Sequence, residues 1–238
     1  MEIEGLIIRQ TPFQDNDMMI TLLAKEKIYS FLARGVMKID SKNASSVNLF
    51  THGKYSLMSG KNGKTLKNAE IINSFPNIRK DFSKLAGVDF ISEITGKLIS
   101  EDKTTEFHEC LLKVLSLLND GFDELTLYLI YFASALRISG YGLDVDECVN
   151  CGQTSHINSV SYADGGFICS DCYNPLNHTK CTARKLKIIR YIFKVNPEQI
   201  GAVEFEKEEV KELLKELIDF ASDKADLYLK SIKLLKNV

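Results

Sequence analysis

Four cysteines form two pairs, Cys148 with Cys151 and Cys169 with Cys172, and two residues separate the members of each pair. Seventeen residues lie between the pairs, a spacing typical of zinc sites. Each pair can turn both sulfurs toward one point, so that two pairs complete a tetrahedral cage with Zn–S distances of about 2.3 Å. Because four thiolates leave no position for water or substrate, the sequence predicts a structural Zn²⁺ site and not a catalytic one.

Two other interpretations of these cysteines fit the sequence less well. A thioredoxin-like redox pair opens a helix, whereas Gly152 follows the first pair and Gly165 and Gly166 precede the second, as in knuckle turns. Disulfides require an oxidising compartment, and residues 1–5 show no basic region followed by a long apolar stretch. We therefore expect a cytoplasmic protein. The alternative ligands near the cage are His156, His178 and Cys181.

The composition predicts a folded protein with an uneven charge distribution. The 238 residues are 45% hydrophobic and suffice for one or two domains, and no apolar run reaches the roughly 18 to 20 residues that span a bilayer. The net charge is −2. Residues 1–82 hold twelve Lys and Arg against eight Asp and Glu, whereas residues 83–147 hold five against twelve. Residues 184–238 hold twelve against ten, so both ends of the chain are basic and the middle is acidic, which is compatible with a nucleic-acid contact despite the negative net charge.

The first eighty residues have the pattern of short β-strands. β-Branched and aromatic residues recur in five segments separated by polar or glycine-containing turns. These segments are residues 4–9, 18–23, 28–34, 47–58 and 66–73. Asn62 followed by Gly63 is a hairpin signal between the last two. Five short strands predict a small closed barrel, with an OB-fold as the first candidate and an SH3-like barrel as the alternative.

Beyond Pro76 the hydrophobic period becomes helical. The expected helices are residues 85–99, 105–118, 124–139, 183–194 and 207–236. The sequence thus predicts an α+β multidomain protein, with a five-stranded OB-like barrel followed by an α-helical domain that contains the four-cysteine zinc module. The expected boundaries are 1–80 for the barrel, 81–238 for the helical domain and 144–182 for the zinc module.

Catalytic motifs are not apparent. Gly63, Lys64 and Thr65 resemble the end of a P-loop, but Met58 stands where that motif needs its first glycine. The paired aspartates, 15 with 17 and 144 with 146, have no third carboxylate or helically spaced histidine, which favours solvated turns over a metal site. No nucleophile and base pair stands out, so we expect a protein that is not an enzyme.

A basic loop should leave the third strand. It carries Arg34, Lys38 and Lys42, and cations beside a barrel face can contact the phosphates of a single strand. Phe50 and Tyr55 could stack on bases if they are exposed. A solvated loop without a DNA contact fits the pattern equally well.

The order of these features resembles the RecO family of recombination and repair proteins. The resemblance rests on residues 5–9, 15–17, 21–23 and 33–35 near the amino terminus, and on residues 140–142, 148–152 and 165–172 farther on. It covers nearly the whole chain. The loop after Gly35 is less rich in arginine than is usual in that family.

This resemblance implies a bacterial, cytoplasmic and nucleoid-associated recombination mediator without enzymatic activity. Such a protein binds single- and double-stranded DNA without sequence specificity, anneals complementary strands and, with RecR, helps to load RecA recombinase. The alternative is a zinc-ribbon adaptor that binds other proteins and not DNA.

The resemblance also implies binding of the acidic, apolar-ended tail of single-stranded-DNA-binding protein. Such a tail requires an apolar pocket with cations at its rim. The predicted helix 183–194 interleaves cations with Leu186, Ile188, Ile189 and Ile192. The candidate tail-binding residues are Arg184, Lys187 and Arg190. A core helix with a solvated basic face is the simpler interpretation of the same pattern.

Overall fold

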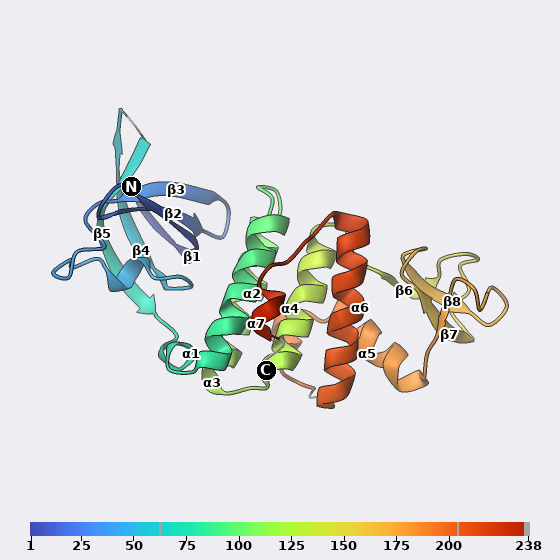
Figure 1. Cartoon of the computed structure of the whole chain (residues 1–238). Helices are drawn as coiled ribbons and strands as arrows, with labels where there is room; N and C mark the ends of the chain where they lie inside the picture. Colours follow the sequence, from blue (N-terminus) through green and yellow to red (C-terminus); the bar gives the residue numbers. More distant parts are fainter. Residues whose placement is uncertain (62, 204, 236–238) are drawn as a thin grey trace. The chain divides into compact units, whose positions relative to one another are not determined.

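The computed structural model describes residues 1–61, 63–203 and 205–235. The chain forms two compact units (Figure 1). Unit 1 contains residues 1–122 and the described segment that begins at Ser231, and unit 2 contains residues 123–230. None of the helices in the described ranges is long and apolar enough to cross a membrane.

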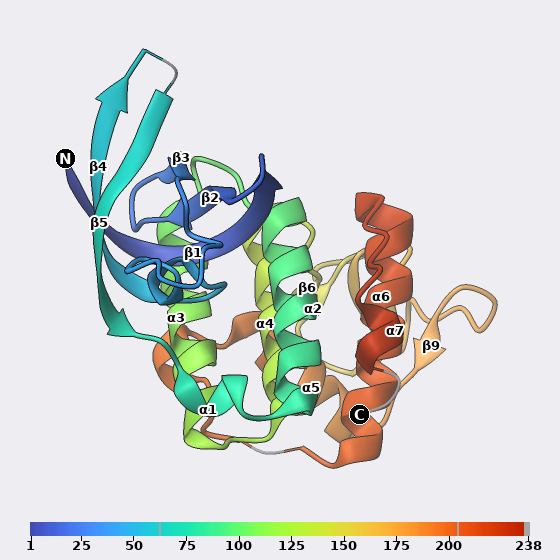
Figure 2. The same cartoon turned by 60° about the vertical axis from the view of Figure 1, so that its left-hand side comes forward.

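A closed five-stranded barrel opens unit 1. Its strands are β1 (Glu2–Phe13), β2 (Asp17–Leu23), β3 (Ile28–Ala33), β4 (His52–Gly60) and β5 (Gly63–Asn73). Their order around the barrel is β1-β2-β3-β5-β4. Neighbouring strands are antiparallel except β3 and β5, which are parallel and paired at Leu32 and Thr65. Figure 2 shows the outer ends of β4 and β5 extending past the other strands.

Apolar side chains from all five strands fill the barrel. Ile7, Ile20, Phe31, Tyr55 and Leu66 are buried members of this core, and β-branched and aromatic residues of this kind favour strands that have one buried face. The short parallel contact between β3 and β5 fits the partly open, five-stranded barrel of an OB-fold. The predicted fold class is confirmed.

Among its described residues, unit 1 also contains four helices: α1 (Pro76–Arg79), α2 (Phe82–Leu98), α3 (Thr104–Asp120) and α7 (Ile232–Leu235). Asp81 caps α2 by accepting a hydrogen bond from the Ser83 amide at 2.9 Å. The Ser92 hydroxyl of α2 donates to the Ile8 carbonyl of β1 at 3.1 Å. At the other end of the sequence, the Ser231 amide and hydroxyl donate to the Glu93 carboxylate at 2.9 and 2.7 Å. The segment around α7 is thereby attached to α2.

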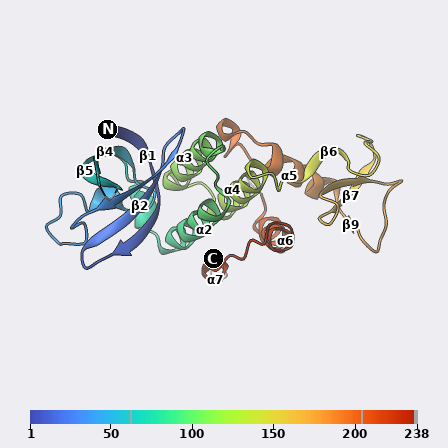
Figure 3. The same cartoon turned by 90° about the horizontal axis from the view of Figure 1, so that it is seen from above.

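Unit 2 combines three helices with a small sheet. The helices are α4 (Glu124–Ile138), α5 (Ala183–Lys194) and α6 (Lys207–Ala225). The sheet contains β6 (Asp144–Cys148), β7 (Ile157–Ser161), β8 (Gly166–Cys169) and β9 (Thr179–Lys180) in the order β6-β8-β7-β9. α4 packs against α5 and α6, and α5 lies between α4 and the sheet (Figures 1 and 3). Arg137 is the one exposed residue of α4, all of whose residues are described, and nearly all the others are buried. α4 therefore forms the centre of this packing.

The predicted start of the fourth strand and the predicted end of the last helix need correction. The predicted strand 47–58 begins only at His52, because Ser45–Val47 form a 3₁₀ turn. The predicted helix 207–236 ends at Ala225, because Asp226 adopts a left-handed conformation with φ of 48° and the Leu227 amide bonds the Ala221 carbonyl at 3.1 Å. Tyr228 lies beyond the end of α6 and is 65% exposed. Asn62 of the predicted hairpin turn, and Lys236, lie outside the described residues.

Candidate nucleic-acid interface and metal centre

The basic loop predicted after the third strand is attached to the turn between β1 and β2. The Gly35 amide donates to Asp17 Oδ1 at 2.7 Å, and the Met37 amide donates to the Asn16 carbonyl at 3.1 Å. Gly35 has φ of 62°, a conformation that favours glycine. Asp17 is therefore a positioning residue for the loop and not the solvated turn residue that its sequence pattern predicts.

Arg34, Lys38 and Lys42 are all exposed on the connection between β3 and β4. None of the ion pairs between described residues includes them. Three unpaired cations on one connection provide positive charge that is available to an anionic partner. This is the arrangement that phosphate contacts require.

The two aromatic residues expected to stack on bases are buried. Phe50 is 3% exposed and Tyr55 is fully buried. The Tyr55 hydroxyl donates toward the carbonyls of Ser46 and Thr51 at 2.9 and 3.1 Å, and burial raises its pKa far above the usual value. The prediction that these rings are exposed was wrong for both residues. Tyr55 instead anchors the end of the basic connection from inside the barrel.

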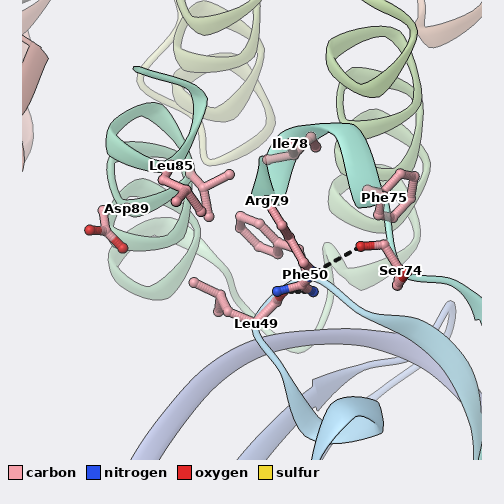
Figure 4. Close-up of a pocket in the computed structure, with 9 residues that line it drawn as sticks. Leu49, Phe50, Ser74, Phe75, Ile78, Arg79, Leu85 and Asp89 are labelled. Carbon is pink, nitrogen blue, oxygen red and sulfur yellow. Dashed lines mark hydrogen bonds between the residues drawn. The ribbon is translucent and has the colours of Figure 1, made fainter. Parts of the chain in front are cut away.

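A cavity of about 300 Å³ lies beside this connection (Figure 4). Its lining residues are Leu49, Phe50, Ser74, Phe75, Ile78, Arg79, Leu85, Val88 and Asp89. Arg79 Nη2 donates to the Leu49 carbonyl at 2.9 Å and to Thr51 Oγ1 at 3.1 Å, and its Nε donates to the Ser74 carbonyl at 3.0 Å. Burial lowers the pKa of Arg79. Arg79 thus connects α1 to the segment that precedes β4, which is a structural role.

The four predicted zinc ligands come together in unit 2. The sulfur atoms of Cys148, Cys151, Cys169 and Cys172 all lie within 4.8 Å of one another. The Cys151 and Cys169 sulfurs are 3.7 Å apart, and a tetrahedral site with Zn–S bonds of about 2.3 Å has sulfur–sulfur edges of about 3.8 Å. The geometry of the residues therefore fits one tetrahedral metal ion.

Backbone geometry on both sides of the sheet produces this cluster. The Cys148 amide donates to the Gln153 carbonyl at 2.9 Å, and the Gly152 amide donates to the Cys148 carbonyl at 2.8 Å, which closes the first knuckle. A Cβ at Gly166 would lie 2.4 Å from the Asp144 carbonyl oxygen. Glycine at this position lets β8 approach β6 and brings the second pair of cysteines to the first.

Two thiols of the cluster have pKa values shifted in opposite directions. Burial opposes ionisation of Cys148, but backbone hydrogen bonds from Cys169, Asn150 and Cys151 lower its pKa to about 6. Hydrogen bonds with Cys151 and Cys169 raise the pKa of Cys172 to about 12. A cation bound between the four sulfurs would favour their thiolate forms together.

The alternative ligands are not part of the cluster that the described residues form. His178 accepts a hydrogen bond from the Asn174 amide at Nδ1, and its Nε2 lies 3.1 Å from Asp164 Oδ2. The Cys181 sulfur lies 3.4 Å from the Thr179 carbonyl. These contacts give His178 and Cys181 partners outside the cysteine cluster.

The cations of α5 are mostly engaged in ion pairs. Arg184 makes a two-point contact with Glu209 at 2.5 and 2.9 Å. Arg190 donates to Asp146 at 2.9 Å and to the Val145 carbonyl at 2.6 Å. Lys187 is exposed and takes part in no ion pair between described residues.

One edge of α5 nevertheless borders an apolar cavity. Its volume is about 300 Å³, and its lining residues are Arg184, Lys187, Ile188, Tyr191, Val203 and Phe205. Ile189 and Ile192, expected to contribute to such a pocket, are instead 1% exposed and fully buried. Two of the three predicted tail-binding cations, Arg184 and Lys187, line the cavity, whereas Arg190 does not.

The chain combines an OB-type barrel with a helical unit that contains a cysteine cluster, which defines a class of multidomain protein. Comparison with known families shows which family within this class the chain belongs to. A family model described as "Recombination protein O N terminal" matches residues 1–75, and one described as "Recombination protein O C terminal" matches residues 79–233. The chain belongs to the RecO family of DNA repair proteins.

Curated relatives support this assignment. Proteins named "DNA repair protein RecO" from Listeria innocua and Bacillus pumilus are each 29% identical to this chain, over 240 and 242 residues, with 99% of the chain and 93% of the relative covered. One from Halalkalibacterium halodurans is 28% identical over 237 residues, with 98% and 92% covered.

Proposed function

We propose that this chain is a recombination mediator that binds single- and double-stranded DNA without sequence specificity and anneals complementary strands. In this proposal residues 1–80 are the DNA-binding domain, and residues 81–238 are the helical domain with the zinc module at 144–182. The observation that carries the proposal is the set of exposed, unpaired cations on the β3–β4 connection of an OB-type barrel. Membership of a DNA repair family supports the same conclusion.

Electrostatic binding suits the annealing step. The repulsion between two phosphate backbones must be screened while the base edges remain free to pair. Exposed cations on a surface connection can contact phosphates without reading base edges. We infer that no nucleotide hydrolysis is needed and that the protein acts as a mediator, helping RecR to load RecA.

The decisive test is neutralisation of the basic connection. The triple variant Arg34→Gln, Lys38→Gln and Lys42→Gln should bind unrelated sequences more weakly and to a similar extent. Each lost phosphate contact should reduce the log–log salt slope by roughly 0.7 for single strands. Filter binding at several salt concentrations measures both quantities.

The matched control is a triple Gln variant at Lys207, Lys211 and Lys215, three exposed residues of α6, which removes the same charge elsewhere. An affinity and slope in the loop variant equal to those of the wild type would remove this connection from the DNA site. Wild-type protein that binds neither DNA form would instead favour the zinc-ribbon adaptor.

The zinc module is proposed to hold one Zn²⁺ on Cys148, Cys151, Cys169 and Cys172. Four thiolates would saturate the ion, and the ion would contribute folding free energy without a role in a reaction. The fit of the sulfur distances to a tetrahedral site supports this part of the proposal.

We propose that the tail of single-stranded-DNA-binding protein binds the apolar cavity beside α5. Ile188, Tyr191 and Phe205 would contact its apolar end, and Lys187 would contact its acidic residues. Arg184 and Arg190 are poor targets for charge reversal because each already pairs with a carboxylate. Lys187→Glu changes the rim without breaking an ion pair that the described residues form.

A fluorescent tail peptide titrated against the Lys187→Glu variant should bind at least several-fold more weakly than it binds the wild type, because a like charge replaces an attractive one. Lys211→Glu on α6 is the control for net charge. If the Lys187→Glu and wild-type proteins bind the peptide equally well, the tail binds elsewhere.

A further inference from the structure

A second cleft lies on the barrel itself, next to the basic connection. Its volume is about 630 Å³, within the usual range of about 300 to 1,000 Å³ for sites that enclose a small molecule. The lining residues come from the end of β1, the β1–β2 turn, β2, β3 with the residue that follows it, and the start of β5. They are Phe13, Gln14, Asp17, Met19, Ser30, Phe31, Leu32, Arg34, Gly63 and Lys64.

The cleft presents an apolar surface that includes an accessible aromatic ring. Phe13 ends β1 and is 42% exposed, although a phenylalanine side chain is strongly favoured in a core. Met19 and Leu32 are half-buried beside it in the same cleft, and Phe31 closes the barrel side. A partly exposed ring next to apolar side chains favours a flat ligand with an apolar face.

Cations border this apolar surface from two different elements. Arg34 directly follows β3, and Lys64 is the second residue of β5. Neither takes part in an ion pair between described residues. The Lys64 ammonium lies 5.9 Å from the centroid of the Tyr29 ring. Asp17 is the carboxylate among the lining residues, and its Oδ1 already accepts the Gly35 amide.

We propose that this cleft holds one unpaired nucleobase stacked on Phe13, with the flanking phosphates on Arg34 and Lys64. The inference rests on the proposed DNA binding and specifies its ligand as a single-stranded segment. A duplex cannot present a base face to Phe13, because each base is stacked between its neighbours. Since every base has such a face, stacking adds affinity for single strands without selecting a sequence.

The test compares Phe13→Ala with wild type on three DNAs of equal length: a single strand, the same strand without bases, and a duplex. Loss of one stacked base should weaken single-strand binding by about 5- to 150-fold. The salt slope should not change, because no phosphate contact is lost. Affinity for the abasic strand and for the duplex should equal that of the wild type.

Two further variants separate stacking from folding. Phe13→Trp keeps an aromatic face and should retain single-strand binding. Phe82→Ala removes another exposed ring of unit 1, which is 86% exposed and does not line the cleft, and should bind as the wild type does.

Equal single-strand affinity of the Phe13→Ala and wild-type proteins would overturn the inference and leave the proposed function intact. An equal loss on the abasic strand would also overturn it, because the defect would then not involve a base. Wild-type protein that binds no DNA would overturn the proposed function and this inference together.

Discussion

Asp17 shows how one side chain connects two parts of the barrel that are distant in sequence. Its carboxylate receives the Gly35 amide at 2.7 Å and thereby fixes the start of the connection that carries Arg34, Lys38 and Lys42. A charge-assisted hydrogen bond of this type contributes about 1.5 to 3 kcal/mol. The position of the basic connection therefore depends on a residue outside it.

Asp17→Ala should lower the free energy of unfolding by about 1 to 3 kcal/mol, because the Gly35 amide loses its acceptor. DNA affinity should fall as well, since the cations are then attached to a less ordered segment. Urea denaturation and filter binding measure the two effects. Asp17→Asn keeps an oxygen acceptor and should recover most of both. Wild-type stability and affinity in the alanine variant would contradict the positioning role.

Burial of single side chains is the property that the sequence predicted least well. Phe50 and Tyr55 lie in a predicted strand that follows the basic loop and fits an exposed binding face, yet Tyr55 points into the barrel and Phe50 is almost completely covered. Phe13, by contrast, is partly exposed, because it ends β1 beside an open cleft. Alternation along a strand predicts which residues share a face, but the bend of the barrel decides which face is covered.

At the scale of elements, the small sheet of unit 2 carries two of the four cysteines, because Cys148 ends β6 and Cys169 ends β8. Replacing Cys148 and Cys169 with Ser should abolish stoichiometric metal binding and destabilise residues 144–182, because a cage that loses two thiolates no longer saturates Zn²⁺. Metal analysis measures the first effect. Hydrogen exchange measures the second, and amides of β1–β5 should keep their protection.

Cys181→Ser is the matched control, since Cys181 belongs to the same module but not to the four-cysteine cluster. This variant should keep its metal and its exchange protection. Full metal occupancy and normal protection in the variant that lacks Cys148 and Cys169 would reject the zinc assignment.

At the scale of the whole molecule, the sequence predicted the order of elements better than their assembly. The five barrel strands, helices α2 to α6 and the cysteine cluster each follow from local periodicity or spacing, whereas α1, the separate α7 and the sheet β6–β9 were not predicted. Local patterns do not contain the contact of Ser231 with Glu93, which lies 138 residues away. The pairing of Arg184 and Arg190 with carboxylates was missed for the same reason, since their partners belong to other elements.

The attachment of Ser231 to α2 also has a consequence for synthesis on the ribosome. Unit 2 is an insertion within unit 1, because the chain leaves unit 1 after Phe122 and returns to it at Ser231. The barrel can fold as soon as β5 has emerged, whereas α2 must wait for more than a hundred further residues before α7 reaches it. During that interval the face of α2 that α7 later covers is open to chaperones or to aggregation.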